Sequence, residues 1–307
     1  MIPRIEIALG LSISRILTGL WQVADQERDG RAFDAAKAVQ AMRPYVDAGF
    51  TTFDMADHYG SSEELVGRFR TEPGAPPTQL LTKWVPEPGP LTKADVRAAV
   101  DRARTRMQVE AIDLLQFHAW SYADPAWIDA MIWLDELRQE GAIRALGLTN
   151  TDTAHLRLLV ESGIPIATNQ LCFSLLDQRA AGAMAQYCTA RGVKLLAFGT
   201  LAGGFLTDRW LGAPEPDWDA LTTWSQMKYG RFIRTAGGWT RFQALLRTVR
   251  TIADRHGVSI ANVACRAILD APAVAGVIVG ARLGERAHLE DNQRITSLVL
   301  TDADRAE

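Results

Sequence analysis

A regular alternation of short apolar runs with longer amphipathic segments is the feature that most constrains how this chain of 307 residues can fold. Short runs rich in β-branched residues are typical of buried strands, and apolar residues three or four positions apart predict helices. The strand candidates span 16–21, 50–54, 79–84, 112–118, 143–148, 165–170, 193–198 and 274–279. Helical patterns cover 33–48, 62–65, 93–107, 127–139, 152–161 (with Thr151 as a candidate cap), 178–191, 242–256, 260–269 and 285–292.

Strands that alternate with helices predict a parallel sheet with helical crossovers, and eight such units favour a closed (β/α)₈ TIM barrel. An open dinucleotide-binding sheet would need a glycine-rich turn after its first strand, and the sequence there, LTGLWQVAD, lacks one. Because composition does not shift along the chain, we expect a single barrel domain over 1–307. Residues 5–14 alternate around Gly10, which predicts an N-terminal β-hairpin that forms a lid on one end of the core.

One long segment, 207–239, interrupts the alternation and is rich in Gly, Pro and Trp. Loops of this length in a compact domain tend to be functional. The pattern leaves two placements open, because the segment could fold over the barrel mouth or pack on the side of the barrel.

Charge and cysteine content limit the classes of partner. The formal net charge of -3 favours neither nucleic acid nor an anionic membrane, and no apolar run approaches the ~20 residues of a membrane span. Cys172, Cys188 and Cys265 lie in apolar surroundings without a second ligand at metal-binding spacing, so we expect buried thiols in a reducing compartment and no metal. We therefore expect a cytoplasmic protein with a small-molecule partner, whose oligomeric state has no signal in the sequence.

Ionisable side chains gather at the ends of three consecutive strand candidates. In GFTTFDMADHYGSSEEL, Asp54 closes a strand and Tyr59 lies in the loop that follows; Lys83 and His118 end the next two strands. The carboxyl ends of barrel strands surround one mouth, so these side chains are expected to meet there. Each alone has a simpler explanation, as a helix cap, a turn residue, a snorkelling lysine or a core histidine. Together they are hard to explain by stability, because partly buried charges need partners.

Such a group suits proton delivery to a carbonyl oxygen. A free tyrosine has a pKa of about 10, and a neighbouring Lys83 ammonium would lower the pKa of Tyr59. Asp54 would hold Lys83, and His118 could donate a hydrogen bond to the same carbonyl oxygen. Three indoles near the strand ends are expected to wall the pocket, those of Trp21, Trp84 and Trp120. A tyrosine acid needs a nucleophile from outside the protein, and hydride from a nicotinamide is the natural candidate.

Several motifs occur together along nearly the whole chain: DMADHYGSSEELVG (54–67), LLTKW (80–84), DLLQFHAW (113–120), IRALGLTN (143–150), ATNQLCFSLLD (167–177) and VIVGARLGERAHLEDN (277–292). In this order they resemble the aldo-keto reductase superfamily. The resemblance implies that Tyr59 is the general acid/base and that Asp54, Lys83 and His118 complete a tetrad. It also implies that NAD(P)H lies across the barrel mouth.

The resemblance also implies a set of cofactor positions. Thr149, Asn150 and Gln170 match positions that bind the nicotinamide carboxamide, and Phe198 replaces the tyrosine that usually stacks on the ring. The loop resembling the one that wraps the pyrophosphate contains Gly199, Thr200, Leu201, Gly203 and Leu206. The segment matching the adenosine half contains Gly280, Ala281, Arg282, His288, Asp291 and Asn292.

Cofactor preference depends on a few of these positions. Arg282 could pair with a 2′-phosphate, whereas Leu283 and His288 depart from the residues usual in NADP-selective members. We therefore expect NADP(H), with NAD(H) as the alternative.

The expected activity is reduction of an aldehyde or ketone to an alcohol, or the reverse reaction, with a sugar as a variant substrate. Two alternatives stay open. One is a regulatory module that binds NADP(H) as a redox sensor and turns over slowly. The other is a lyase in which Lys83 forms a Schiff base.

Overall fold

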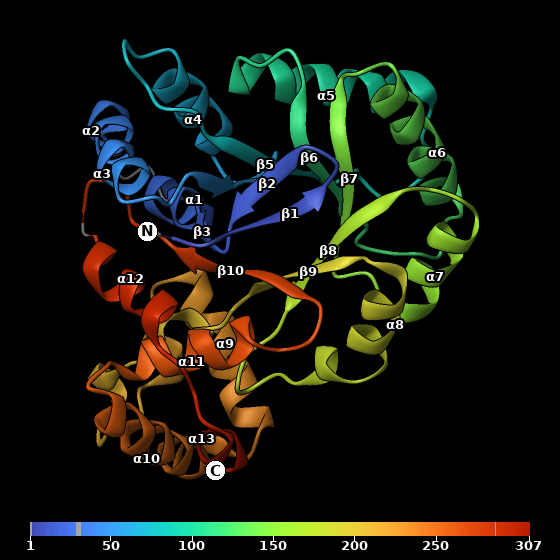
Figure 1. Cartoon of the computed structure of the whole chain (residues 1–307). Coiled ribbons are helices and arrows are strands. Elements are labelled where there is room, and N and C mark those ends of the chain that lie inside the picture. Colours follow the sequence, from blue (N-terminus) through green and yellow to red (C-terminus); the bar gives the residue numbers. More distant parts are fainter. Residues whose placement is uncertain (1, 29–31, 286) are drawn as a thin grey trace.

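The computed structural model describes residues 2–28, 32–285 and 287–307, and within these ranges eight parallel strands close into a barrel. The barrel order is β10-β3-β4-β5-β6-β7-β8-β9, which confirms the predicted (β/α)₈ class (Figure 1). The strands are β3 (Ile16–Gly19), β4 (Thr52–Asp54), β5 (Gln79–Trp84), β6 (Ile112–Phe117), β7 (Ile143–Thr149), β8 (Ile166–Cys172), β9 (Lys194–Phe198) and β10 (Val274–Gly280).

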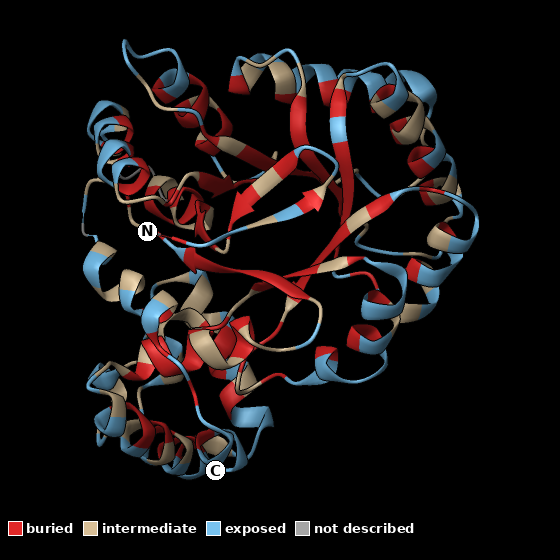
Figure 2. Cartoon of the chain, viewed as in Figure 1, coloured by how far each residue is buried: buried red, intermediate tan, exposed pale blue. Residues whose placement is uncertain are grey.

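Helices surround the barrel, and their buried faces turn toward the strands (Figure 2). The helices are α1 (Trp21–Glu27), α2 (Ala35–Gln40), α3 (Met42–Asp47), α4 (Ser62–Arg70), α5 (Lys93–Met107), α6 (Ala126–Gln139), α7 (Thr153–Glu161), α8 (Ala183–Arg191), α9 (Trp224–Thr235), α10 (Gly238–His256), α11 (Ile260–Leu269), α12 (Leu289–Ser297) and α13 (Asp302–Ala306). In the described part of the chain, no helix combines the length and apolar character needed to cross a bilayer.

Local sequence explains where the best-defined helices begin. Helix α5 starts with a capping box in which Thr92 and Asp95 each satisfy a backbone N–H of the other. Helix α11 starts in the same way with Ser259 and Asn262. Because these caps satisfy donors that a helix start leaves free, the predicted boundaries of both helices are confirmed.

The predicted N-terminal hairpin is present as β1 (Arg4–Ala8) paired with β2 (Leu11–Ser14). Ile7 and Ile13 belong to one buried cluster with Leu17, Leu81 and Leu114. These leucines lie in the N-terminal halves of their strands β3, β5 and β6. The hairpin therefore closes the end of the barrel opposite the carboxyl ends of the strands, and the mouth is left at the other end (Figure 1).

Several predicted boundaries are wrong. The first barrel strand ends at Gly19, and Trp21 begins the short helix α1. The single helix expected over 33–48 is divided at Ala41 into α2 and α3. Asp152, rather than Thr151, caps α7. The helix expected over 285–292 starts at Leu289, and Arg286 lies outside the described residues.

The segment 207–239 is not without regular structure, because it contains the 12-residue helix α9. Phe205, Trp210, Trp218 and Trp239 lie close together in an aromatic cluster on the side of the barrel. Helix α9 then extends to the barrel mouth, where Trp224 contacts Trp21 at a ring-centroid distance of 5.5 Å. Both placements left open by the sequence are therefore realised, by different parts of the segment.

Candidate active site

Four polar side chains form a hydrogen-bonded network inside the barrel. Asp54, at the end of β4, accepts from Lys83 Nζ at 2.8 Å and from the side-chain amide of Gln170 at 2.6 Å. Gln116 donates to the same carboxylate at 3.3 Å and accepts from Gln170 at 3.0 Å. Lys83 is 1% exposed and Asp54 is 3% exposed, so the ion pair is removed from water and needs these extra partners.

Alternation along the strands explains why these residues meet. In β5, Leu81 packs in the barrel interior, so Lys83, two residues later, points inward as well. In β6, Leu114 and Gln116 share the inward face in the same way. Gln116 was not predicted, although its position two residues before His118 was a usable signal.

Tyr59 lies against this ion pair. The Lys83 ammonium is 4.7 Å from the centroid of the Tyr59 ring, and its second hydrogen bond goes to the carbonyl of Met55 at 2.7 Å. Trp21 packs edge-to-face on the phenol ring at a centroid distance of 4.9 Å. The structure thus brings together the predicted acid, phenol and amine at the carboxyl ends of the strands.

The pKa of Tyr59 departs from the expected direction. Burial raises the pKa of the phenol above 10.0, and the neighbouring Lys83 charge acts in the opposite direction without outweighing burial. For Lys83, burial alone would lower the pKa of the ammonium, but Asp54 and Tyr59 raise it. Lys83 therefore lowers the pKa of Tyr59 as expected, but burial raises that pKa by more, so the expected net lowering is wrong. Near pH 7, Tyr59 is a neutral phenol and Lys83 is a cation.

His118 is a neutral imidazole at the same mouth. Burial, and next the Lys83 charge, lower the pKa of His118 to about 4. Its Nε2 lies 3.5 Å from the side-chain amide of Asn150, and its buried Nδ1 has no hydrogen-bond partner in the described part of the chain. A neutral imidazole has one N–H to donate, which fits a role in orienting a substrate oxygen.

Helix α1 holds the loop that carries Tyr59. Glu27, the last residue of α1, accepts hydrogen bonds from the backbone N–H of Ser61 at 3.0 Å and from the Ser61 hydroxyl. Gly60 has φ of +56°, and a Cβ there would lie 2.0 Å from the Glu27 carboxylate. The Ser61 side chain therefore bonds to α1 and makes no capping bond to α4. Neither α1 nor Glu27 was predicted, because a seven-residue helix without a side-chain cap has little sequence signal.

The three predicted pocket indoles lie in different surroundings. Trp21 contacts Tyr59, and Trp120 is 67% exposed with its ring 5.0 Å from that of His118. Trp84 follows the inward-facing Lys83, so it points outward, packs on Phe117 and is only 6% exposed. The expectation that Trp84 walls the mouth is corrected for this reason. Trp224 of α9 belongs to the segment that the sequence left free to fold over the mouth, and it lies at the mouth against Trp21.

The predicted nicotinamide positions have polar groups available at the mouth. The hydroxyl of Thr149 is buried and has no hydrogen-bond partner among the described residues, and Asn150 next to it is exposed. An amide both donates and accepts, so this pair of side chains fits a carboxamide. Gln170 differs, because its amide is already bonded to Asp54 and Gln116.

The predicted pyrophosphate loop follows β9 and packs under α9. A Cβ at Gly199 would lie 2.2 Å from the Tyr229 hydroxyl, and one at Gly203 would lie 2.9 Å from the Ser225 carbonyl. Both positions require glycine because the helix lies so close. Of the remaining loop positions, Leu201 is partly exposed, whereas Thr200 and Leu206 are buried.

At the predicted adenosine end, Arg282 is already paired. Its guanidinium donates to the buried Asp25 of α1 at 2.8 Å and lies 3.3 Å from Glu285. The other predicted positions include Gly280 and His288, which are exposed, the buried Ala281, and Asp291 and Asn292, which are partly exposed on α12. The Asp291 carboxylate accepts from the Ser259 hydroxyl at 3.2 Å.

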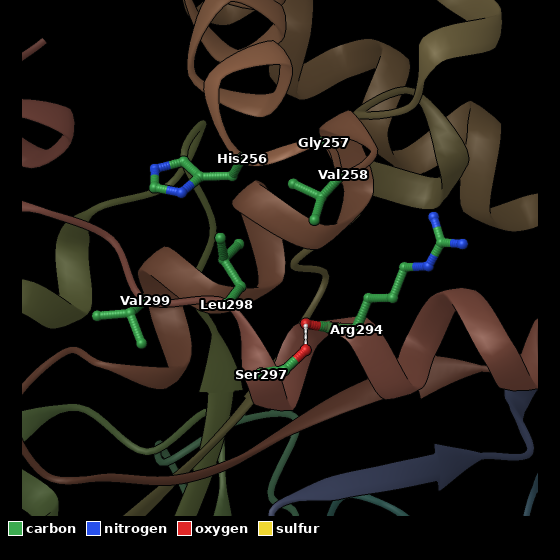
Figure 3. Close-up of a pocket in the computed structure, with 7 residues that line it drawn as sticks. All are labelled: His256, Gly257, Val258, Arg294, Ser297, Leu298 and Val299. Atoms are coloured by element: carbon green, nitrogen blue, oxygen red, sulfur yellow. Dashed lines mark hydrogen bonds between the residues drawn. The ribbon is translucent and has the colours of Figure 1, made fainter.

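A hollow of about 450 Å³ lies elsewhere, between the carboxyl ends of α10 and α12 (Figure 3). It is lined by His256, Val258, Arg294 and Leu298, among others. His256 is paired with Asp304 at 2.8 Å, so the hollow shows no side chain placed for chemistry.

Two cysteines are buried, as predicted, but Cys172 at the end of β8 is only partly buried. Burial raises the pKa of Cys172 to about 11 and that of Cys265 to about 12. These thiols are therefore weak nucleophiles near neutral pH.

Comparison with known proteins gives a consistent result. The model of the Aldo/keto reductase family matches residues 15–307. The aldo-keto reductase YhdN of Bacillus subtilis (strain 168) is 26% identical, with 96% of this chain and 89% of that protein covered. The flagellar radial spoke protein 5 of Chlamydomonas reinhardtii is 28% identical over 76% of this chain, which covers 56% of that protein. The structure of the glycerol dehydrogenase AKR11B4 from Gluconobacter oxydans superposes with a TM-score of 0.79 at 25% identity, covering 100% of this chain and 92% of that one.

Proposed function

The chain belongs to the aldo/keto reductase family of NAD(P)-dependent oxidoreductases, and we propose that it reduces an aldehyde or ketone to an alcohol with Tyr59 as the proton donor. The observation that carries this proposal is the Lys83 ammonium, which lies between the Asp54 carboxylate at 2.8 Å and the Tyr59 ring at 4.7 Å. Burying an ion pair costs desolvation free energy that its hydrogen bonds must offset, so its presence here supports a functional role for Lys83.

The residues at the mouth fit the nicotinamide end of the cofactor. The Thr149 hydroxyl, which has no partner in the described part of the chain, and the exposed Asn150 would hold its carboxamide, and Phe198 would stack on the ring. When bound, the reduced cofactor supplies hydride to the carbonyl carbon. The residues predicted to bind the adenosine half of the cofactor fit a 2′-phosphate less well, because Arg282 already contacts two carboxylates.

In this mechanism, the neutral Tyr59 donates its phenolic proton to the carbonyl oxygen as negative charge develops there. Lys83 remains protonated and stabilises the phenolate left behind. Asp54, with Gln116 and Gln170, keeps the ammonium in place. His118, neutral because of burial and the Lys83 charge, orients the substrate oxygen with its N–H. In the reverse direction, the Tyr59 phenolate accepts the alcohol proton.

The lyase alternative requires a neutral, accessible Lys83 amine. Lys83 is 1% exposed, and Asp54 and Tyr59 raise the pKa of its ammonium against the effect of burial, so the structure does not favour a nucleophile there. Borohydride trapping of a carbonyl compound on Lys83 would support the lyase instead.

A spectrophotometric screen tests the proposed activity. Oxidation of NADPH and of NADH is followed with aromatic aldehydes, short aldehydes, diketones and aldoses, with Tyr59→Phe as the inactive control. We expect turnover with at least one class, and loss of that turnover in the variant. Tight NADPH binding without turnover of any compound would instead support the redox-sensor alternative.

A further inference from the structure

Lys228 of α9 lies at the barrel mouth, and none of the acidic residues that the structure describes forms an ion pair with it. The Lys228 ammonium is 4.6 Å from the centroid of the Phe198 ring and 5.3 Å from that of Tyr229. Phe198 ends β9, so the ammonium lies at the carboxyl ends of the barrel strands. Cation–π contacts of this kind hold an ammonium in place but do not neutralise its charge.

Two other cations near the mouth are paired with carboxylates. Lys83 pairs with Asp54 and Arg282 with Asp25, both at 2.8 Å. Across the residues that the structure describes, no carboxylate oxygen lies within 4.0 Å of Lys228. Among the described residues, Lys228 is therefore a cation without a carboxylate in direct contact, at the carboxyl ends of the strands where the substrate is expected to bind.

A nearby carboxylate does not remove this charge. Asp177 is bound in a two-point contact by Arg179, at 2.8 and 2.6 Å. Two-point guanidinium–carboxylate pairs are strong, so Asp177 already has a cationic partner and compensates the charge of Lys228 only in part.

The charge of Lys228 is also felt at the reaction centre. Lys228 is one of the groups that keep the pKa of His118 low, after burial, Lys83 and His58. Lys228 is an exposed residue, and partial burial of its ammonium lowers the pKa of Lys228 itself. Lys228 thus lies within electrostatic reach of the imidazole that is expected to orient the carbonyl oxygen.

We propose that Lys228 binds a carboxylate or phosphate group of the carbonyl substrate, so that the enzyme prefers anionic aldehydes and ketones over neutral ones. This inference rests on the proposed carbonyl reduction and adds the substrate class. Trp21 and Trp224, which contact each other at the same mouth, would pack on the carbon skeleton of the substrate while Lys228 holds its charged end. The Phe198 and Tyr229 rings orient the ammonium before the substrate arrives.

Matched substrate pairs test the preference at saturating cofactor. We compare 4-carboxybenzaldehyde with methyl 4-formylbenzoate, and glyceraldehyde 3-phosphate with glyceraldehyde. The anionic member of each pair should have a kcat/KM higher by about tenfold or more, as expected for a charged hydrogen bond that is partly shielded from water. Lys228→Met should reduce this ratio to about one by raising KM for the anionic member only, and Lys228→Arg should keep it. Lys194→Met, at the opposite end of β9, is the matched control and should behave as wild type.

A binding measurement keeps the inference testable if none of the aldehydes is reduced. Quenching of tryptophan fluorescence by benzoate and by the neutral benzamide reports the site without turnover. Benzoate should bind wild type more tightly than benzamide, and Lys228→Met should abolish the difference. Equal affinities for the two ligands in wild type would overturn the inference. So would a Lys228→Met variant that weakens only NADPH binding, because Lys228 would then contact the cofactor diphosphate. If none of the carbonyl compounds is reduced but wild type still binds benzoate more tightly than benzamide, the proposed activity is refuted and the anion site is supported.

Discussion

Gly60→Ala is expected to destabilise the protein because the loop that carries Tyr59 has no room for a side chain. The φ of +56° at Gly60 costs an alanine about 1 kcal/mol. The new Cβ would also lie 2.0 Å from the Glu27 carboxylate, which must then move and give up its two bonds to Ser61. Each of the two hydrogen bonds to the charged Glu27 contributes about 1.5 kcal/mol at the low end, so the total cost is about 4 kcal/mol or more.

Urea unfolding measures this cost, and Gly10→Ala is the matched control. Gly10 has φ of +69°, but its Cβ would have no neighbour within 4 Å, so Gly10→Ala reports backbone strain alone, about 1 kcal/mol. In the double variant Glu27→Ala/Gly60→Ala, the bonds to Ser61 are lost only once. The double variant should therefore be about 3 kcal/mol more stable than the sum of the single effects predicts, since each bond contributes about 1.5 kcal/mol. Additive effects, or a Gly60→Ala cost no larger than that of Gly10→Ala, would refute the reasoning.

Three further predictions concern the charges at the site. Lys83→Met should cost about 3–5 kcal/mol in urea unfolding, because Asp54 is left as an unpaired buried charge, and should lower kcat by at least about 100-fold. His118→Asn should alter the pH dependence of stability. His118 takes up a proton near pH 6.5 in the unfolded chain and at about 4 in the folded protein, so wild type loses stability as the pH falls from about 6.5 to 4. The variant should not show this loss of stability. Asp25→Asn should remove one of the two carboxylate contacts of Arg282 and raise the ratio of kcat/KM for NADPH over NADH by at least about fivefold.

Each of these has a clear contrary outcome. A Lys83→Met variant with wild-type kcat would remove Lys83 from the chemistry. Parallel pH–stability curves for wild type and His118→Asn would show that His118 is not the group that titrates. An unchanged cofactor ratio in Asp25→Asn would mean that Asp25 does not control Arg282.

The barrel and the positions of Asp54, Tyr59 and Lys83 were predictable because they follow from periodicity. Strand ends in a parallel barrel converge on one mouth, so residues placed there by a local pattern must come close. Side chains also alternate in direction along each strand. This alternation predicts that Lys83 points inward, that Trp84 points outward, and that Gln116 faces the barrel interior.

Other parts of the site depend on contacts between distant segments. Arg282 and Asp25 are separated by 257 positions, and their pairing leaves no mark in either local sequence. The direction of the Tyr59 pKa shift was also out of reach, because it depends on whether burial or the Lys83 charge is stronger once the loop is packed. Helix α9 was missed because its buried positions, Tyr229, Gly230 and Ile233, form too short an apolar face to stand out among glycine, proline and tryptophan.

The central claim is that Tyr59 donates the proton in a cofactor-dependent reduction, and single-turnover kinetics of Tyr59→Phe test it most directly. Enzyme saturated with NADPH is mixed with an aldehyde that the wild type reduces, and NADPH oxidation is followed while cofactor affinity is measured separately. We predict unchanged NADPH affinity and a rate lower by roughly 100-fold or more, since the phenolic proton is lost while the ring remains. A Tyr59→Phe variant that oxidises NADPH at the wild-type rate would contradict the claim.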